Sequence, residues 1–484
     1  MKYIKYLSLV AFAAATTAFT SCSDYLDKEP ENTLPVESID YTDMSDLYKP
    51  VSGVYAKLRT GAHHWVIAPQ LMIRDDDMWS GRTDDQGDLV SIGNYNYMSG
   101  YWGLNEMWNQ FYGVIKTANS ALEALDNYAE NMTSESQLST YRSYSGEVRF
   151  LRAYIYYRLV QCFGPVTILR TNSQTDLTRS TVNAVYRYAL EDLQYAMDNC
   201  PRLRPNEMEH IGAVTAYTAE MLAAKIYLNQ GDYDKVKTLT DDIINSGKFE
   251  LYSDYYQLFK IPGKLCNESL FECQCTDFGT GSGDLVDVDN WFTFQGPGSL
   301  GGWNFMRFYP AFETWAENRG ETVRLTTTFL QGGGAVTPDG EEVTSGTLTD
   351  FFNGKCYVPK SQLTEGRTKY GCNNNVRIFR YADVLLMNAE ALVRLGQSGD
   401  TPFNKVRTRA GMPAVQNVTV DNIIDERRIE LAGEFGERYN DLVRTGKAAE
   451  VLGGNGWTVD KTYYPLPFQQ LSDVEALKNE PIDE

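Results

Sequence analysis

Three carboxylates near the C-terminus could carry acid–base chemistry: Glu426, Glu430 and Glu434 lie four residues apart, on one face of a predicted helix. Paired carboxylates are the groups that hydrolyse glycosidic bonds. Arg427, however, precedes Glu430 by three residues, and Arg438 follows the last of these carboxylates by four. Ion pairing at helical spacing lowers carboxylate pKa values, whereas a general acid needs a raised one. The pattern therefore favours a structural charge ladder over a hydrolase site.

Other catalytic motifs are missing from the sequence. The segment Pro297-Gly-Ser299-Leu-Gly departs from a nucleophile elbow at its first position, and no phosphate-binding glycine pattern lies between a predicted strand and helix. Three histidines, His63, His64 and His210, leave little room for histidine-based metal chemistry. We therefore predict that the protein is not an enzyme.

Aromatic residues outside helical stripes are the better candidates for function, among 32 Tyr, 21 Phe and 8 Trp. An indole ring can cover the apolar face of a sugar, while Asp, Asn and Arg side chains bond its hydroxyl groups. Segments 75–82, 93–105 and 279–303 combine these residue types in predicted loops. The candidate ligand-binding residues are Asp77, Trp79, Arg82, Trp102, Asn105, Trp291 and Trp303. A core position is the alternative for each Trp, and it is favoured for Trp108 and Trp315.

Segment 279–303 allows two interpretations. Its glycines alternate with Trp291, Phe292, Phe294 and Trp303, a composition that does not predict a helical stripe. The segment is either a strand-and-loop cap on the core or an exposed aromatic surface that stacks on a flat ligand. Three nearby aspartates could hold a structural calcium ion, but they lack the glycine and distal Glu of a calcium loop; they are Asp284, Asp287 and Asp289. We predict no cofactor.

The N-terminus is predicted to be an export signal. Lys2 and Lys5 precede a short apolar run. The predicted signal spans residues 1–21, and Cys22 follows it directly, before the polar residues Ser23 and Asp24. This order is typical of a bacterial lipoprotein whose Cys22 is lipidated, with residues 22–40 as a tether; plain secretion is the alternative. Several acyl chains on Cys22 would anchor the protein stably in a membrane.

The composition of the chain excludes further classes of function. The chain has 484 residues, is 43% hydrophobic, as in ordinary globular proteins, and carries a formal net charge of −20. That charge argues against a nucleic-acid partner. The seven cysteines after Cys22 are odd in number and widely spread, which does not predict a disulfide framework.

The elements that must position these residues are mostly helices. Apolar residues at steps of three and four predict helices over 104–127, 138–163 and 180–199. A small–large–Gly pattern occurs twice, at Ala224, Tyr227 and Gly231 and again at Ala389, Leu392 and Gly396. It is typical of tetratricopeptide hairpins. We therefore predict a mainly α fold with helical repeats at about 104–250 and 376–450, separated by a loop- and strand-rich insertion at about 265–375.

Short motifs along nearly the whole chain resemble the SusD/RagB family of outer-membrane nutrient-binding lipoproteins. Together they are more specific than any one of them. In chain order they are Ser21-Cys22-Ser-Asp-Tyr-Leu-Asp27, Gly146-Glu-Val-Arg-Phe-Leu-Arg-Ala-Tyr154, Cys162-Phe-Gly-Pro-Val166, Arg380-Tyr-Ala-Asp-Val-Leu-Leu-Met-Asn-Ala-Glu390, Phe403-Asn-Lys-Val-Arg-Thr-Arg-Ala-Gly411, Asp425-Glu-Arg-Arg-Ile-Glu-Leu431, Gly436-Glu-Arg-Tyr-Asn-Asp-Leu442 and Tyr464-Pro-Leu-Pro467.

The resemblance implies one SusD-like domain over residues 41–484, with a right-handed superhelical body of tetratricopeptide-like repeats and a variable ligand face. It also implies a surface-exposed outer-membrane lipoprotein that captures oligosaccharides and delivers them to a SusC-like TonB-dependent transporter. An oligopeptide-capturing RagB-type member is the alternative, followed by a glycoside hydrolase.

Overall fold

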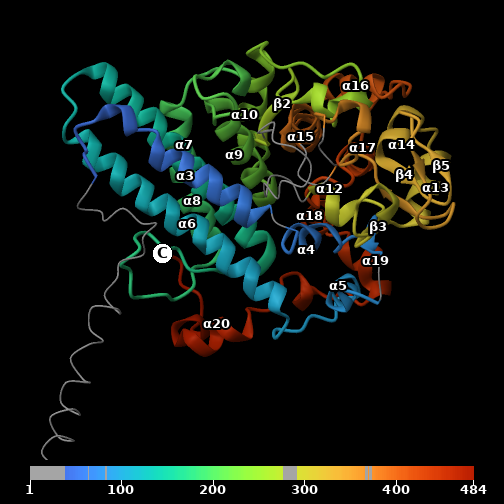
Figure 1. The fold of residues 1–484 in the computed structure, drawn as a ribbon, viewed down its shortest axis with the longest axis horizontal. Helices are drawn as coiled ribbons and strands as arrows, with labels where there is room; N and C mark the ends of the chain where they lie inside the picture. Colours follow the sequence, from blue (N-terminus) through green and yellow to red (C-terminus); the bar gives the residue numbers. More distant parts are fainter. Residues whose placement is uncertain (1–38, 64, 82–83, 276–290, 366–368, 370–372) are drawn as a thin grey trace, which may run out of the picture. The chain divides into compact units, whose positions relative to one another are not determined.

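The computed structural model describes residues 39–484 except 64, 82–83, 276–290, 366–368 and 370–372 (Figure 1). The chain divides into two compact units, Met1–Asp46 and Leu47–Glu484. The described part of the first unit holds one turn of 3-10 helix, Met44–Asp46. The second unit is mainly helical, as predicted.

Long helices dominate the first half of the second unit. Its elements are α3 (Lys49–Lys57), the π-helical turn η4 (Leu58–Ala62), α4 (Ala68–Met72), β1 (Met78–Ser80), α5 (Gly87–Gly93), α6 (Trp102–Ala129), α7 (Glu135–Phe163), α8 (Val182–Asn199), α9 (Ala216–Gln230) and α10 (Tyr233–Asn245). The three long helices predicted here are present as α6, α7 and α8. Helix α6 begins two residues before the predicted start, so that Trp102 lies inside its first turn.

Consecutive helices pack against one another: α6 on α7, α7 on α8, α8 on α9 and α9 on α10. A capping box at Ser134 starts α7, and Gly164 ends it. Gly231 ends α9 in the left-handed region, at φ 74°, and Gly396 adopts nearly the same angle, φ 73°, after α15 (Tyr381–Arg394). Glycine adopts this conformation without a Cβ penalty. Both hairpins predicted from the small–large–Gly pattern therefore turn in the same way.

Strands and short helices make up the middle of the chain. They are α11 (Tyr255–Leu258), β2 (Ser269–Cys273), α12 (Trp291–Gln295), β3 (Met306–Phe308), α13 (Pro310–Asn318), α14 (Val323–Thr328), β4 (Phe329–Gln331), β5 (Ala335–Val336), β6 (Glu342–Val343), β7 (Phe351–Asn353) and β8 (Val376–Arg380). One antiparallel sheet has the strand order β1-β3-β7-β4, and two-stranded sheets join β2 to β8 and β5 to β6. Strand β1 thus joins the insertion from more than 200 residues upstream.

The expectation that segment 279–303 contains no helix is wrong. Its described part opens with α12, in which Trp291, Phe292 and Phe294 are all buried. The Trp291 ring packs against Phe294 and Phe435. Burial of three large aromatic side chains stabilises this short helix, although the local sequence does not favour one.

The C-terminal part consists of α15, α16 (Asp400–Arg409), α17 (Val420–Glu430), α18 (Glu437–Arg444), α19 (Ala448–Leu452) and α20 (Phe468–Asp473). Helix α15 packs on α10, α16 and α17. The two tetratricopeptide-like hairpins are therefore in contact, although about 165 residues separate them in sequence.

The predicted charge ladder is wrong in its pairing. Helix α17 ends at Glu430, so Glu434 lies beyond it. Arg427 bonds Asp383 and Asp441, and Arg438 bonds Asp76. The carboxylates bind cations from other elements instead: Arg409 Nη2 lies 2.6 Å from Glu430 Oε1, and Arg380 bridges Glu430 and Glu434 at 3.0 and 2.7 Å. The ion pairs are structural, as predicted, but they join different elements of the fold instead of residues within one helix.

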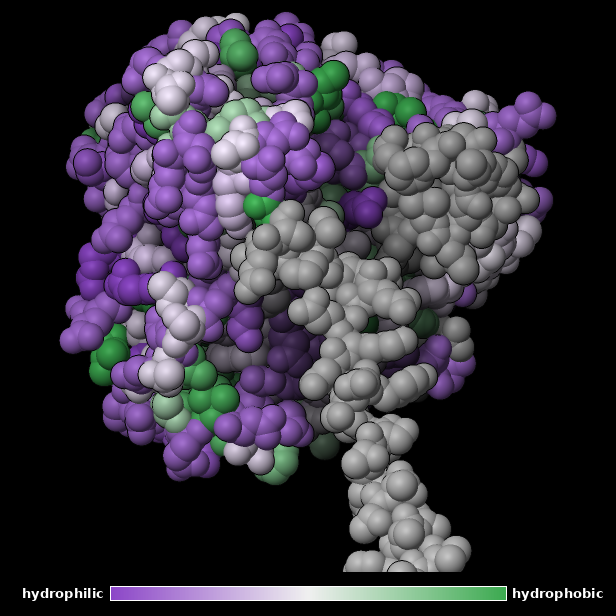
Figure 2. Space-filling view, turned by 60° about the vertical axis from the view of Figure 1, so that its left-hand side comes forward, coloured by the Kyte–Doolittle hydropathy of each residue, from purple (hydrophilic) through white to green (hydrophobic). Residues whose placement is uncertain are grey.

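The described residues on the face drawn in Figure 2 are mostly hydrophilic. Figure 2 shows one face on which hydrophobic residues form small separate patches, some of them at its lower end. Across the part of the chain that the structure describes, no helix is both long and apolar enough to cross a membrane.

Candidate functional site

Three tryptophans from distant segments meet at one place on the protein. The Trp65 ring lies 6.1 Å from the Trp102 ring and 5.7 Å from the Trp303 ring, centroid to centroid, at interplanar angles of 65° and 87°. Phe305 contacts both Trp65 and Trp303. We call Trp65, Trp102 and Trp303 the tryptophan cluster. The sequence prediction named Trp102 and Trp303, and the structure brings them to the same partner.

A tightly folded loop positions Trp303. The Trp303 N–H donates to Thr293 O at 2.7 Å, which ties the loop to α12. A Cβ atom on Gly302 would lie 2.1 Å from the carbonyl oxygen of Gly296, so only glycine fits at this close approach. A further backbone bond, from Phe305 N to Phe294 O, leads directly into β3. The loop is therefore held on both sides of Trp303.

Trp102 occupies the start of α6 and is 49% exposed. Its neighbour Tyr101 packs edge-on against it, with ring centroids 5.9 Å apart. Asn105 lies one helical turn further on and accepts a hydrogen bond from Gln470 Nε2 at 2.9 Å. The start of α6 therefore presents the exposed indole of Trp102, followed one turn later by the amide of Asn105.

A hollow of about 440 Å³ opens beside the tryptophan cluster; it is lined by Trp65, Asp85, Gly302, Trp303, Asn304 and Phe305. Its walls combine aromatic rings with a carboxylate and an amide. Rings of this kind cover apolar ligand faces, and the polar groups bond hydroxyls. Because the rings are steeply inclined to one another, they could contact different faces of one bound chain. The arrangement suits binding, and the described residues that line the hollow include no pair of acid–base groups.

The other predicted ligand residues lie elsewhere. Asp77 is buried, and its Oδ1 accepts a hydrogen bond from Arg428 Nε at 2.6 Å. Burial raises the pKa of Asp77 to about 6, although Arg428 opposes the shift. Trp79 lies in β1, not in a loop, and stacks on Tyr309 at 6.0 Å and 24°. Trp291 is buried in α12 and does not present its ring to solvent.

Several predictions fall on residues outside the described ranges. They concern Arg82, the lipidation site Cys22 with the signal and most of the tether, Cys372, and the aspartates Asp284, Asp287 and Asp289. Among the described residues, no group of three or more His, Cys, Asp and Glu side chains could hold a metal ion. The described cysteines carry free thiols, all of them buried except Cys266, which is half-buried.

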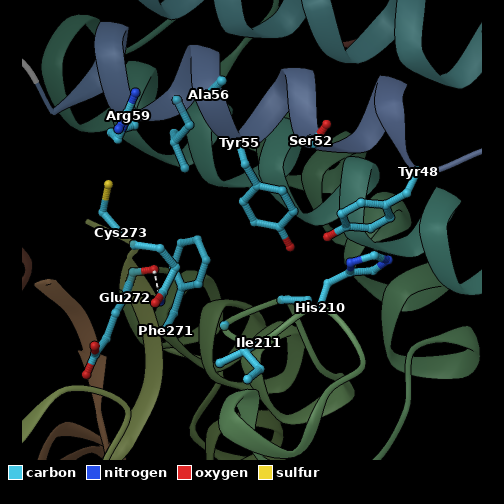
Figure 3. A pocket seen from close by; sticks show the side chains of 14 residues that line it. Tyr48, Ser52, Tyr55, Ala56, Arg59, His210, Ile211, Phe271, Glu272 and Cys273 are labelled. Atoms are coloured by element: carbon cyan, nitrogen blue, oxygen red, sulfur yellow. Dashed lines mark hydrogen bonds between the residues drawn. The ribbon is translucent and has the colours of Figure 1, made fainter. Parts of the chain in front are cut away.

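A second hollow, of about 410 Å³, lies between α3, the 210–213 turn and the end of β2 (Figure 3). Its aromatic rings are already used within the protein: Tyr48 stacks on His210 at 3.4 Å, and the hydroxyls of Tyr48 and Tyr55 donate to Glu147. Burial raises the pKa of Glu147 to about 8, and these two hydrogen bonds oppose the shift. We therefore rank the tryptophan cluster above this hollow as a ligand site.

Trp65 is the residue that the sequence reasoning missed. It follows His63 and His64 in a stretch without helical periodicity, the same signal that selected Trp102 and Trp303. His63 itself is buried and contacts Tyr154 and Phe435.

Comparisons with known proteins give a consistent result. A family model described as "SusD family" matches residues 288–480, and one described as "Starch-binding associating with outer membrane" matches residues 24–228. A SusD-like protein of Bacteroides ovatus is 25% identical over 89% of this chain and 81% of its own length. SusD-like protein P2 of Formosa agariphila is 27% identical over 96% of both chains.

Solved structures show the same fold. A laminarin-binding SusD-like protein superposes with a TM-score of 0.75 at 25% identity, covering 89% of this chain and 98% of its own. Surface glycan-binding protein A from Bacteroides thetaiotaomicron, solved with laminarihexaose, has a TM-score of 0.75 at 24% identity, over 90% of this chain and 98% of its own.

Proposed function

Because this chain belongs to the SusD family, we propose that it is a surface-exposed glycan-binding lipoprotein of the outer membrane. It captures oligosaccharides at the tryptophan cluster and delivers them to a partner TonB-dependent transporter. The observation that carries the proposal is the meeting of Trp102 and Trp303 on Trp65 beside an open hollow.

The chemistry of this surface supports a sugar ligand. Burying an aromatic ring against a sugar's C–H face removes apolar area from water, and each ring can contribute 150–250 Å². Asn304 and Asp85 line the same hollow and can bond hydroxyl groups. Two relatives with this fold are named for laminarin or were solved with laminarihexaose. The proposal therefore names a glucan-type oligosaccharide as the first ligand to test.

Anchoring and delivery rest on the N-terminus and on the family. Cys22 stands at the end of the export signal, where acylation would hold the protein at the membrane. The second family model is described as associating with the outer membrane. The resemblance to SusD-like proteins supports delivery to a SusC-like transporter as part of this proposal.

The C-terminal carboxylates support binding without catalysis. Burial alone would raise the pKa of Glu430, but Arg409, Arg380 and Arg324 lower it to about 2. A carboxylate this acidic cannot serve as a general acid near neutral pH. Glu426 is also fully buried, with Arg324 Nη1 2.7 Å from its Oε1.

The test is isothermal titration of the intact protein with laminari-oligosaccharides, maltooligosaccharides, xyloglucan oligosaccharides and mixed peptides. We expect binding to a glycan series, with Trp65→Ala weakening it. Trp315→Ala, at a half-buried indole on α13, is the matched control and should bind normally. Binding of peptides alone would favour the oligopeptide-capturing alternative, and release of reducing ends from a bound glycan would establish a hydrolase.

A further inference from the structure

One exposed face of α6 leads away from the tryptophan cluster. Trp102, Asn105, Asn109, Gly113 and Lys116 follow one another at steps of three and four residues, so they share a face. At a rise of 1.5 Å per residue, the stripe from Trp102 to Lys116 is about 21 Å long. Asn109 and Lys116 are exposed, as is Trp102. The stripe is therefore long enough for several sugar units, although Gln470 contacts Asn105 and Asn109, and the Lys57 side chain lies beside Gly113.

The far end of this stripe opens into a groove of about 280 Å³. We call it the α6 groove; its lining residues include Trp108, Tyr112, Leu169, Leu177, Val474 and Leu477 from α6, the 167–177 loop and the C-terminal segment. Its polar lining consists mainly of amides, from Asn109, Asn172, Gln174 and Gln470. An apolar floor with a few polar groups at its rim is typical of ligand pockets. Asn172 and Gln174 already bond backbone carbonyls of the protein, so Asn109 is the amide that we expect to bond a sugar hydroxyl.

Both walls of the α6 groove are bonded to α6. On one side, Gln470 Nε2 on α20 donates to the side-chain oxygens of Asn105 and Asn109, at 2.9 and 3.0 Å. On the other side, Tyr112 donates to Thr167 O at 2.8 Å, and Asn172 Nδ2 donates to Lys116 O at 3.0 Å. These bonds fix the width of the groove. In Figure 1, α20 lies beside α6, as its contacts require.

Exposed apolar residues connect the two sites. Phe468, at the start of α20, is 65% exposed, and its N–H donates to Ser99 O. Met98, next to Ser99, is 58% exposed. The surface near the start of α6 therefore carries Met98 and Phe468 as well as Trp102, and large exposed apolar side chains in such proximity are typical of interaction surfaces.

We propose that the glycan site extends from the tryptophan cluster along the exposed face of α6 into the α6 groove, so that one uncharged oligosaccharide occupies both. The proposal rests on the proposed function and adds to it a length preference. A short oligosaccharide fills the tryptophan cluster alone. A longer chain also reaches Asn105 and Asn109, whose side-chain nitrogens have no hydrogen-bond partner in the described part of the chain.

The test is titration with laminari-oligosaccharides and maltooligosaccharides of two to eight units. Affinity should keep rising with length beyond the shortest oligomer that binds. Asn109→Ala should weaken binding of the longest oligomer about five-fold, the loss of roughly one hydrogen bond, and leave the shortest unchanged. Asn109→Trp, which fills the groove, should reduce the longest oligomer to the affinity of the shortest. Asn127→Ala, on the same helix but beyond the groove, is the control.

The outcomes separate the two proposals. If Trp102→Ala weakens every oligomer while both Asn109 variants bind the longest one normally, the extension is wrong and the tryptophan cluster stands. If Trp102→Ala binds every oligomer normally, the glycan site does not include Trp102 and the extension from it fails. If no oligomer binds the native protein, the proposed function fails and the extension fails with it. An affinity that stops rising at the shortest binding oligomer would also overturn the extension. Thermal melting of each variant shows whether it is folded.

Discussion

The indole of Trp65 stands edge-on to the indole of Trp303, at 87° and 5.7 Å between centroids, although about 240 residues separate them in sequence. Neither ring lies flat on the other, so each keeps part of its face available. The two rings reach this arrangement because the 296–305 loop is bonded to α12 and leads into β3. The proposed ligand surface thus depends on contacts between segments that are distant in sequence.

Removing one indole from the tryptophan cluster should weaken oligosaccharide binding without unfolding the protein. Trp102→Ala and Trp303→Ala should each cost about 1–3 kcal/mol, up to roughly a hundredfold in affinity, because a stacking ring is lost. Calorimetry measures the loss, with circular dichroism as the folding control. Normal binding by both variants would move the ligand site elsewhere, and unfolding of both would show that they are core residues.

Gly302→Ala should disturb the loop that carries Trp303. The added Cβ would meet the Gly296 carbonyl at 2.1 Å, so the backbone must shift. We expect weaker oligosaccharide binding with a small change in melting temperature. Gly454→Ala, at a position with open space around the added atom, is the control. Unchanged affinity in Gly302→Ala would mean that the loop does not position the ligand.

Glu430→Gln should destabilise the protein and leave ligand binding intact. Glu430 is fully buried and contacts three arginines, and removing one partner of a buried ion pair costs about 3–5 kcal/mol. Glu475→Gln breaks an exposed pair with Lys478 and should cost less than about 1 kcal/mol. Urea unfolding measures both. A loss of binding with unchanged stability would place Glu430 in the ligand site.

Acid should weaken the fold partly through the same carboxylate. The pKa of Glu430 is about 2 in the folded protein, below the ordinary glutamate value of 4.5. Its contribution is therefore complete above about pH 4.5 and is lost as the pH falls toward 2. Urea midpoints measured between these pH values should decline less steeply in Glu430→Gln than in the native protein. Equal slopes would contradict the low pKa.

Glu147 should change the pH dependence of stability in the opposite direction to Glu430. Burial raises its pKa from 4.5 to about 8, so the folded state binds a proton that the unfolded state has released. The favourable contribution is complete below pH 4.5 and is lost as the pH rises through 8. Glu147→Gln keeps an oxygen that can accept from Tyr55. We expect the free energy of unfolding of this variant to fall less between pH 4.5 and 8 than that of the native protein. A parallel stability profile would show that Glu147 is ionised in the fold.

Cys22→Ala should release folded protein from the membrane, because the anchoring contacts read from the sequence depend on acyl chains at this residue. Fractionation of cells that lack the transporter partner is the measurement. A variant that remains in the membrane fraction would contradict the assignment of Cys22 as the anchor.

The sequence predicted the helical body well because its signals are local. The apolar stripes of α6, α7 and α8 and the glycines that end α9 and α15 act within a few residues of themselves. The same local reasoning misjudged α12, since burial of Trp291 and its neighbours against Phe435 is a tertiary effect. Arg427 and Arg438 were misassigned for the same reason: their partners come from other elements.

The candidate site was predictable only in part. Trp102 and Trp303 could be selected as aromatic residues outside regular stripes, but nothing in the sequence indicates that they share a partner. Trp65 carries the same signal, but it lies outside segments 75–82, 93–105 and 279–303, whose composition selects the other candidates. Asp77 has the right chemistry for a sugar contact, yet its burial against Arg428 depends on α17, some 350 residues away.

The pairing of β1 with β3 has a kinetic consequence. It joins Met78 to Phe308 and so closes a loop of about 230 residues. Closing a loop of this length costs conformational entropy before any contact repays it, whereas the helices between these strands form from near neighbours. We therefore expect the face that carries the tryptophan cluster to assemble after the helices. On refolding from urea, recovery of oligosaccharide binding should lag behind recovery of the helical signal.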